Sequence, residues 1–444
     1  MAAYRTGLAV CILFLLSLVE MAMAPAASAS IVGYTLVDLG TLGGTTEAIA
    51  INELGISAGH GLAAVDGGFA SHAAVWSVSD SGVSTRVLGR GEAFDINDLG
   101  EVAGLLQFSG PTLWRLKTDG TFDTILLPTL GGVGGHVLSI NNTGYAVGMA
   151  MHATGTLAAL WHITPLGITV QGFSGVDLIA INDNQEIAAR SSSGDAIFLF
   201  TIQSDGSVTQ QLLKTFPSGS LVEVTNINNA GAIVGAVNTE TVDEFGDPVF
   251  HSEAFILTKD SQMALLPPLA AGGNAVARGI NDHFQVVGFS DGLAVLWSPL
   301  SSGGYGVTDL GANAIAFDIN EASWIAGFSG GHAALWTIPT PAEQVGGLAA
   351  EVDSIVSTGA LTQGQATSLK AKLSAAEDKL NADDANSAVL ILRAFINQVN
   401  AQIKAGQMSG KLTQQQIQDL QALIEGAQAI IDRLCSQVPM PRAC

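Results

Sequence analysis

Basic side chains are scarce in this chain, which has 17 Lys and Arg residues against 39 Asp and Glu residues and a net charge of -22 at pH 7. The imbalance is concentrated in residues 31–340, where 8 basic residues face 28 acidic ones. A surface this acidic repels nucleic acid and anionic lipid before contact. The composition therefore argues against both and leaves cations and basic or neutral partners. An unidentified protein or glycan at a cell surface is the partner we expect.

Cysteine is also rare, with three residues in the whole chain: Cys11, Cys435 and Cys444. The last two lie close together at the C-terminal end. If the protein is exported, it matures where thiols oxidise, and the default prediction is a small disulfide loop between Cys435 and Cys444. A disulfide to a second chain is the alternative.

Long apolar runs are missing except at the N-terminus. Arg5 precedes an apolar run of residues 8–19, and Ala27-Ser28-Ala29 follows with the small-x-small pattern of a signal-peptidase site. The run is about half as long as a permanent membrane helix needs. We predict a signal peptide over residues 1–29, cleavage near Ala29, and a secreted extracellular or periplasmic protein without a transmembrane segment. An uncleaved membrane anchor is the alternative.

Catalytic motifs are missing as well. Two matches to G-x-S-x-G, at residues 288–292 and 327–331, lack the helix that must follow a nucleophile elbow. The histidines show neither the helical spacing nor the Cys-x-x-Cys neighbours of a zinc site. We therefore assign no catalytic residue from motifs.

A repeat fills the first three quarters of the chain. The dipeptide Ile-Asn occurs seven times, with the asparagines Asn52, Asn97, Asn141, Asn182, Asn228, Asn281 and Asn320. Successive copies are 39 to 53 residues apart, which is typical of a four-stranded propeller blade. Repetition favours a structural role in a turn for these asparagines, although together they could also line one rim of a channel.

Each copy repeats the same order of strands and turns. An alternating segment ends at Ile-Asn, and an Asn-x-x-Gly hairpin turn follows in most copies. A second strand then carries a glycine, and a fourth strand ends the copy. The third strand ends on tryptophan in five copies, at Trp76, Trp114, Trp161, Trp297 and Trp336, and the fourth and fifth copies have Phe or aliphatic residues there, around Phe198 and Phe255.

The two ends of the repeat region complement each other. Residues 34–40 form an Asp-Leu-Gly strand that no Ile-Asn segment precedes, and the seventh copy reaches Pro339 without a fourth strand. Pairing the spare strand with the incomplete copy removes both exposed edges. We predict a mainly β fold, a seven-bladed β-propeller over residues 31–340, closed by the N-terminal strand.

These repeats resemble the extracellular HAF-repeat family. The resemblance rests on residues 38–44, on the seven Ile-Asn segments with their glycines, and on residues 72–76, 254–255 and 332–336. The His-Ala-Phe of the family name is nowhere intact. The resemblance implies propeller-like repeats and an extracellular location, but no activity.

Helical periodicity replaces the repeat after Pro341. Apolar stripes, capping boxes at Thr362 and Thr413, and helix ends at Gly359 and near Gly406 predict a four-helix bundle over residues 345–435, with a short tail at 436–444. The segment 392–399 and the glycine-punctuated helices around it resemble the FIMAH domain of secreted bacterial proteins. That resemblance implies attachment or partner binding, and without it the stripes are simply a bundle core.

Two groups of acids are candidates for chemistry. Asp95, Asp177, Asp318 and Glu223 stand shortly before Ile-Asn turns, but the four do not share one offset. An insertion in the fifth copy holds Asp243, Glu244 and Asp247, oxygen ligands of the kind calcium takes. Their spacing matches no EF-hand, so we favour a solvated loop and expect no cofactor.

Two classes of function remain. The first is a secreted, non-enzymatic binding, adhesion or scaffold protein that presents an acidic propeller surface, with a purely structural surface-layer component as a variant. The alternative is an extracellular polysaccharide hydrolase or lyase, which would need two or three carboxylates to converge in the channel.

Overall fold

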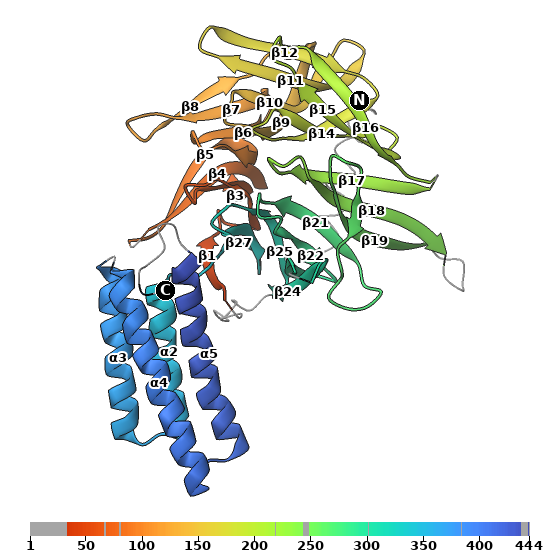
Figure 1. Ribbon diagram of the computed structural model, residues 1–444. Coiled ribbons are helices and arrows are strands. Elements are labelled where there is room, and N and C mark those ends of the chain that lie inside the picture. The colour runs from red at the N-terminus through yellow and green to blue at the C-terminus, as the bar shows by residue number, and fades with distance from the viewer. Residues whose placement is uncertain are drawn as a thin grey trace. The chain divides into compact units, whose positions relative to one another are not determined.

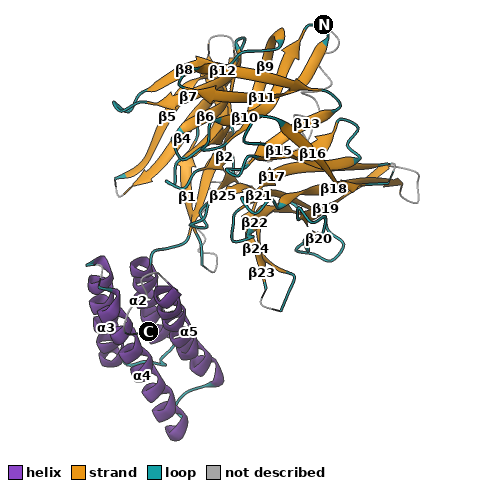
Figure 2. Cartoon of the chain, turned by 45° about the horizontal axis from the view of Figure 1, so that its top comes forward, coloured by secondary structure: helices purple, strands orange, loops and turns teal. Residues whose placement is uncertain are grey.

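The computed structural model describes residues 33–65, 68–79, 81–217, 219–242, 248–300, 302–382, 384–436 and 443. They divide into two compact units, one up to Thr337 and one from Ile338 onwards. The first unit is built from strands and the second from four helices (Figure 2), so the fold is mainly β with C-terminal helices, as predicted. The expected signal peptide, Asp243, Glu244, Asp247 and Cys444 lie outside the described residues.

The first two repeats form one seven-stranded antiparallel sheet. Its strands are β2 (Thr46–Ile51), β3 (Ser57–Val65), β4 (Gly68–Ser79), β5 (Gly82–Ile96), β6 (Glu101–Leu106), β7 (Gly110–Leu116) and β8 (Phe122–Leu126). This differs from the expectation of a separate sheet for each copy. The reason is β5, which runs without a turn from the last strand of one repeat into the first strand of the next. β5 pairs with β4 up to Arg90 and with β6 from Gly91 onwards, and Gly89 and Gly91 have φ of 146° and 157° at this change of partner.

The remaining repeats form five further sheets in the described part of the chain. A three-stranded sheet contains β10 (Tyr145–His152), β11 (Gly155–Thr164) and β12 (Gly167–Phe173), next to β9 (Gly131–Ile140). One four-stranded sheet contains β13 (Val176–Ile181), β14 (Glu186–Ser191), β15 (Ala196–Ile202) and β16 (Val208–Thr215). Another contains β17 (Ser220–Ile227), β18 (Ile233–Val242), β19 (Pro248–Leu257) and β20 (Met263–Leu265). The next contains β21 (Ala275–Ile280), β22 (Val286–Ser290), β23 (Leu293–Pro299) and β24 (Tyr305–Ala312).

The last sheet joins the two ends of the repeat region. It contains β25 (Ala314–Ile319), β26 (Ile325–Ser329) and β27 (His332–Thr337), and β1 (Thr35–Gly40) is its fourth strand. β1 pairs antiparallel with β27, with Leu36 opposite Trp336, so the spare N-terminal strand completes the seventh copy. Figure 1 shows the red β1 beside the teal β27. The pairing gives β27 a neighbour on both sides and removes one exposed edge.

The Asn-x-x-Gly turn has the same geometry in all seven copies. Each asparagine Oδ1 accepts a hydrogen bond from the backbone N–H four residues later, as from Ile56 to Asn52 at 2.9 Å. The residue three positions after the asparagine always has positive φ. Four copies place glycine there, and the others place Gln185, Phe284 and Ser323 at φ of 59° to 62°. Backbone geometry is therefore preserved where the glycine signal is lost.

The second glycine is required by close packing of strands. The first strand of six copies has a bulge just before Ile-Asn, as between Ala48 and Ala50. A Cβ at Gly59 would overlap the carbonyl oxygen of Glu47, and a Cβ at Gly235 would overlap that of Glu223. The fourth copy places Ala189 at this position.

The tryptophans that end the third strands lie between neighbouring repeats. All five are at most 1% exposed. Trp161, Trp297 and Trp336 donate their indole N–H to a carbonyl of the preceding repeat, at Pro128, Pro267 and Leu310. The same side chains therefore fill the core and join one sheet to the next.

The helical unit consists of α2 (Pro341–Ser357), α3 (Gln363–Asn381), α4 (Ala385–Ser409) and α5 (Gln414–Ser436). Its core includes Val345, Val352, Leu369, Leu392 and Leu420, which come from all four helices. The predicted capping box at Thr362 is present, and Thr340 forms a further one with Glu343.

One helix boundary was predicted wrongly. α4 continues past Gly406 to Ser409, and Gly410 ends it with φ of 61°. Gly406 instead makes room for Leu412, whose side chain would overlap a Cβ there. Near the end of α5, Cys435 is disulfide-bonded. Its pairing with Cys444 stays a prediction.

Candidate functional site

The seven repeat asparagines form a closed cycle of hydrogen bonds. The side-chain Nδ2 of each donates to the backbone oxygen of the asparagine in the next repeat, over 2.8 to 3.1 Å. The last bond, from Asn320 to Asn52, returns to the first repeat. Each asparagine is at most 5% exposed. The asparagine side chains that hold the turns therefore also link each repeat to the next.

A second closed cycle passes through the residues that follow the asparagines. Each backbone N–H donates to a side-chain oxygen of the equivalent residue in the next repeat, over 2.7 to 3.0 Å. The members are Glu53, Asp98, Asn142, Asp183, Asn229, Asp282 and Glu321. Five of them are acids, and the pKa of Glu53 is raised by burial and by Glu321, Asp98 and Asp282 nearby. These acids are used to connect repeats.

Asp95 and Asp318 stand two residues before their asparagines and connect neighbouring first strands. Asp95 accepts hydrogen bonds from Ile96 N and, across the repeat boundary, from Ile140 N at 2.8 Å. Asp318 does the same with Ile319 N and Ile51 N. Both oxygens of each carboxylate are therefore already engaged with the backbone.

Burial raises the pKa of both carboxyls. For Asp318 the pKa rises to about 7, because desolvation and the charge of Asp95 outweigh the hydrogen bonds from Ile51 and Ile319. The pKa of Asp95 is also raised by desolvation. A carboxyl that titrates near neutrality is a candidate acid or base, but the backbone amides that hold both oxygens favour a structural role.

Asp177 and Glu223 stand five residues before their asparagines, and each forms an ion pair with an arginine. Arg190 Nε lies 3.1 Å from Asp177, and Arg278 Nη1 lies 2.7 Å from Glu223. The four predicted acids thus occupy two positions of the repeat, two residues and five residues before the asparagine. Each carboxylate already has a hydrogen-bond or ion-pair partner, which a free catalytic carboxylate would not have.

The position five residues before the asparagine holds further titratable residues that the motif search missed. It carries Glu47, Glu92 and His136 in the first three copies, before Asp177 and Glu223. Aligning the seven copies on Ile-Asn would have found this column. The bulge made it difficult to see, because an inserted residue shifts the alternation of inward and outward side chains.

Glu47, Glu92, Glu223, Arg278 and His60 come together, and we call these five residues the first-strand cluster. His60 lies opposite Glu47 on β3. The pKa of Glu47 is raised mainly by burial, while the charges of His60 and Arg278 lower it and that of Glu92 raises it. His60 Nδ1 lies 3.3 Å from the carbonyl oxygen of Ala93, beside Glu92, and Arg278 pairs with Glu223, so residues of repeats one, two, five and six contribute to the charge around Glu47.

Aromatic and imidazole rings adjoin the cluster. The ring of Phe94 lies 5.9 Å from those of His60 and His136, edge-on in both cases. Burial lowers the pKa of His136 to about 4, so this imidazole is neutral at pH 7. Arg278 lies 5.7 Å from the centre of the Phe289 ring. The polar groups of the cluster therefore have apolar neighbours.

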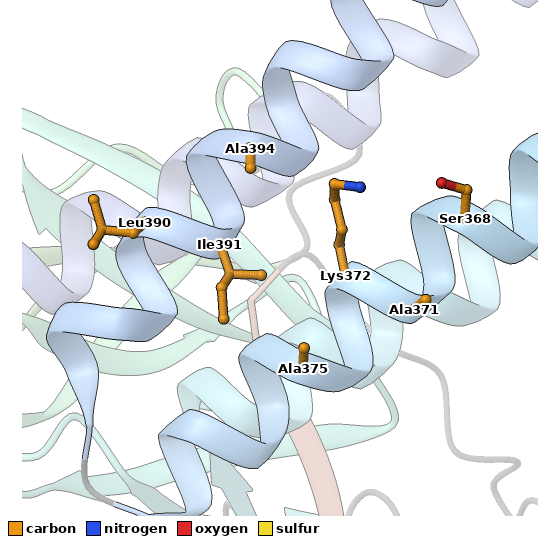
Figure 3. A pocket seen from close by; sticks show the side chains of 7 residues that line it. All are labelled: Ser368, Ala371, Lys372, Ala375, Leu390, Ile391 and Ala394. Carbon is orange, nitrogen blue, oxygen red and sulfur yellow. The ribbon is translucent and has the colours of Figure 1, made fainter.

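Other candidate sites are weaker. In the described part of the chain, no group of three or more His, Cys, Asp or Glu side chains is arranged to hold a metal ion. None of the described helices is long and apolar enough to cross a membrane. The helical unit has an open groove of about 460 Å³ between α3 and α4, where Lys372 and Ser368 stand among alanine, leucine and isoleucine side chains (Figure 3).

The family model of the FIMAH domain matches residues 345–425, which confirms the resemblance of the helical unit. No curated protein matches the chain. A solved streptogramin B lyase is similar over 70% of this chain and 100% of its own length, at 12% identity and a TM-score of 0.45. A gluconolactonase from Xanthomonas campestris is similar over 72% and 99%, at 11% identity and a TM-score of 0.39. Likenesses this weak carry no argument.

Proposed function

We propose that the strand unit is a seven-bladed β-propeller and that this protein is an exported binding or adhesion module. The two cycles of seven hydrogen bonds support seven equivalent units around one axis, because a bond from the seventh unit returns to the first. The pairing of β1 with β27 supports closure by the N-terminal strand. The HAF-type repeats and the apolar N-terminus favour export.

Binding is favoured over catalysis by how the inner carboxylates are used. Asp95 and Asp318 accept hydrogen bonds from backbone amides, and Asp177 and Glu223 form ion pairs with arginines. A glycosidase needs one carboxyl that donates a proton and a second that attacks or activates water. In this proposal the FIMAH domain attaches the protein to a cell surface or partner, as the resemblance to FIMAH domains of secreted bacterial proteins implies.

A binding screen tests the proposal. The purified chain is applied to glycan arrays and to isolated cell envelopes, beside a version that ends at Thr337 and a version that begins at Ile338. We expect saturable binding by the whole chain and no polymer turnover. Absence of binding to every surface would contradict the proposal.

An extracellular polysaccharide hydrolase or lyase is the second candidate, and the pKa of Asp318, near 7, is the observation that favours it. Substrate panels of polysaccharides would reveal turnover. If any polymer is cleaved and Asp318→Ala, Asp95→Ala or Glu223→Ala abolishes cleavage, the enzyme replaces the binding module. Polysaccharide cleavage that survives all three substitutions would not depend on these carboxylates.

A further inference from the structure

Glu47 is a buried acid without a partner. It retains 9% of its exposure, and among the described residues its carboxylate has neither a hydrogen bond nor an ion pair. Its oxygens are not among the fully buried polar atoms that lack a partner in the described chain, so they reach solvent and are open to a ligand. Its surroundings are the rest of the first-strand cluster, since His60, Arg278 and Glu92 all act on its charge.

The charges of this region do not balance. Arg278 is committed to Glu223, and Arg190 to Asp177. Glu92 has no hydrogen bond or ion pair among the described residues, so neither Glu47 nor Glu92 forms an ion pair there, although the charge of Arg278 acts on Glu47. Arg278 Nε is also buried without a hydrogen-bond partner in the described chain. This N–H is a donor and would need an acceptor, whereas the carboxylates of Glu47 and Glu92 can accept hydrogen bonds from a cationic donor.

The residues around the two carboxylates are compatible with an organic ligand. Phe94 is half-buried between His60 and His136. The residues at its position in other repeats include Ile49, Leu138, Ile179 and Phe317, each also half-buried. Sites for small ligands combine such apolar walls with a few placed polar groups.

We propose that the first-strand cluster binds a primary ammonium group carried on an organic frame, with Glu47 and Glu92 as its acceptors. An ammonium has three N–H donors and one positive charge, which meets both deficits at once. The acidity of the repeat region draws such a cation towards the site. This proposal rests on the binding function and names the chemistry of its ligand.

Two matched pairs of probes test it by calorimetry on the whole chain. Nα-acetyl-lysine amide is compared with its Nε-acetylated form, and glucosamine with N-acetylglucosamine. Each pair differs in the ammonium charge, and the pairs distinguish a lysine side chain from an amino sugar as its source. We expect at least one ammonium probe to bind and its acetylated partner to bind at least about tenfold more weakly, as loss of a charge-assisted hydrogen bond requires.

Glu47→Gln removes the acceptor charge and keeps the shape. We expect it to weaken ammonium binding at least about tenfold while the melting temperature stays equal, because the carboxylate of Glu47 has no hydrogen bond or ion pair to lose among the described residues. Glu253→Gln is the control, since Glu253 is an exposed acid on β19.

Equal binding of charged and acetylated probes, an unchanged affinity in Glu47→Gln, or no binding of either ammonium probe would overturn the inference. If envelopes or glycans still bind in that case, the binding function survives without this ligand class. If the ammonium probes bind but neither envelopes nor glycans do, the ligand class is supported and the proposed binding to surfaces is contradicted.

Discussion

Asp318 and Glu47 are both acids of low exposure on first strands, but Asp318 accepts hydrogen bonds from two backbone amides, whereas Glu47 accepts none from the described residues. Asp318 also accepts a long hydrogen bond of 3.4 Å from Asn226 of the fifth repeat. One acidic side chain of a first strand therefore connects repeats, whereas the other makes no hydrogen bond among the described residues. Only the partners of the carboxylate separate the two roles.

Asp318 makes the stability depend on pH. Its folded pKa of about 7 lies above the unfolded value of about 4, so between these values the folded state holds a proton that the unfolded state has released. Stability contributed by this group therefore increases as pH falls from 7 towards 5, by up to about 1.4 kcal/mol per pH unit. We expect chemical denaturation at several pH values to show this increase in the wild type and its loss in Asp318→Asn. Asp260→Asn, at an exposed turn, should keep the wild-type slope; an identical slope in Asp318→Asn would contradict the assignment.

Among the elements, the Asn-x-x-Gly turn shows how sequence and backbone geometry diverge. Gln185 holds φ of 62° in the turn where Gly100 holds 73°. A left-handed conformation costs an ordinary residue about 1 to 2 kcal/mol, and glycine loses part of that advantage through its greater unfolded entropy. The fourth turn thus carries a strain that its neighbours avoid, and the hydrogen bonds to Asn182 keep it in place.

Substitutions at Gln185 and Gly100 test this explanation of turn strain. Gln185→Gly should raise the unfolding free energy by about 0.5 kcal/mol, because the side chain makes no hydrogen bond in the described structure. Gly100→Ala should lower it by about 1 kcal/mol, since the added Cβ also comes within 3.4 Å of Leu116. Urea denaturation of both variants measures the two effects. The same sign for both would contradict the turn assignment.

For the whole molecule, closure of the repeat region joins residues nearly 300 positions apart. β1 pairs with β27, Asn320 and Glu321 bond to the first repeat, and Leu39 is buried at 3% exposure against the last repeat. Closure protects a strand edge that would otherwise be exposed. Most of the stability of the strand unit should therefore depend on a short N-terminal segment.

Weakening that segment should destabilise the whole unit. Deletion of residues 31–41 is expected to lower the melting temperature by many degrees. Leu39→Ala, a graded version, should cost about 2 to 5 kcal/mol through the cavity it leaves, and Thr35→Ala, at an exposed position of the same strand, should cost little. Scanning calorimetry measures all three. An unchanged melting curve on deletion would mean that β1 does not close the unit.

Patterns local in sequence were sufficient for much of this protein. The repeat of Ile-Asn, the glycines after it, the tryptophans and the helical stripes predicted a mainly β unit followed by four helices, because periodicity and turn chemistry act over a few residues. Even the pairing of β1 with β27 followed from counting strands. The continuous β5 and the extension of α4 past Gly406 were not predictable in this way, because a change of strand partner at two glycines and a contact with Leu412 depend on packing.

The candidate site was decided by tertiary structure. The sequence named Asp95, Asp177, Asp318 and Glu223, but not that backbone amides or arginines would occupy all four. The sequence did not single out Glu47, which stands five residues before Asn52. A carboxylate has a free or a satisfied charge according to what folding brings beside it. For Asp95 and Asp318, the partners are backbone amides 45 and 267 residues away in the sequence, whereas Arg190 is 13 residues from Asp177.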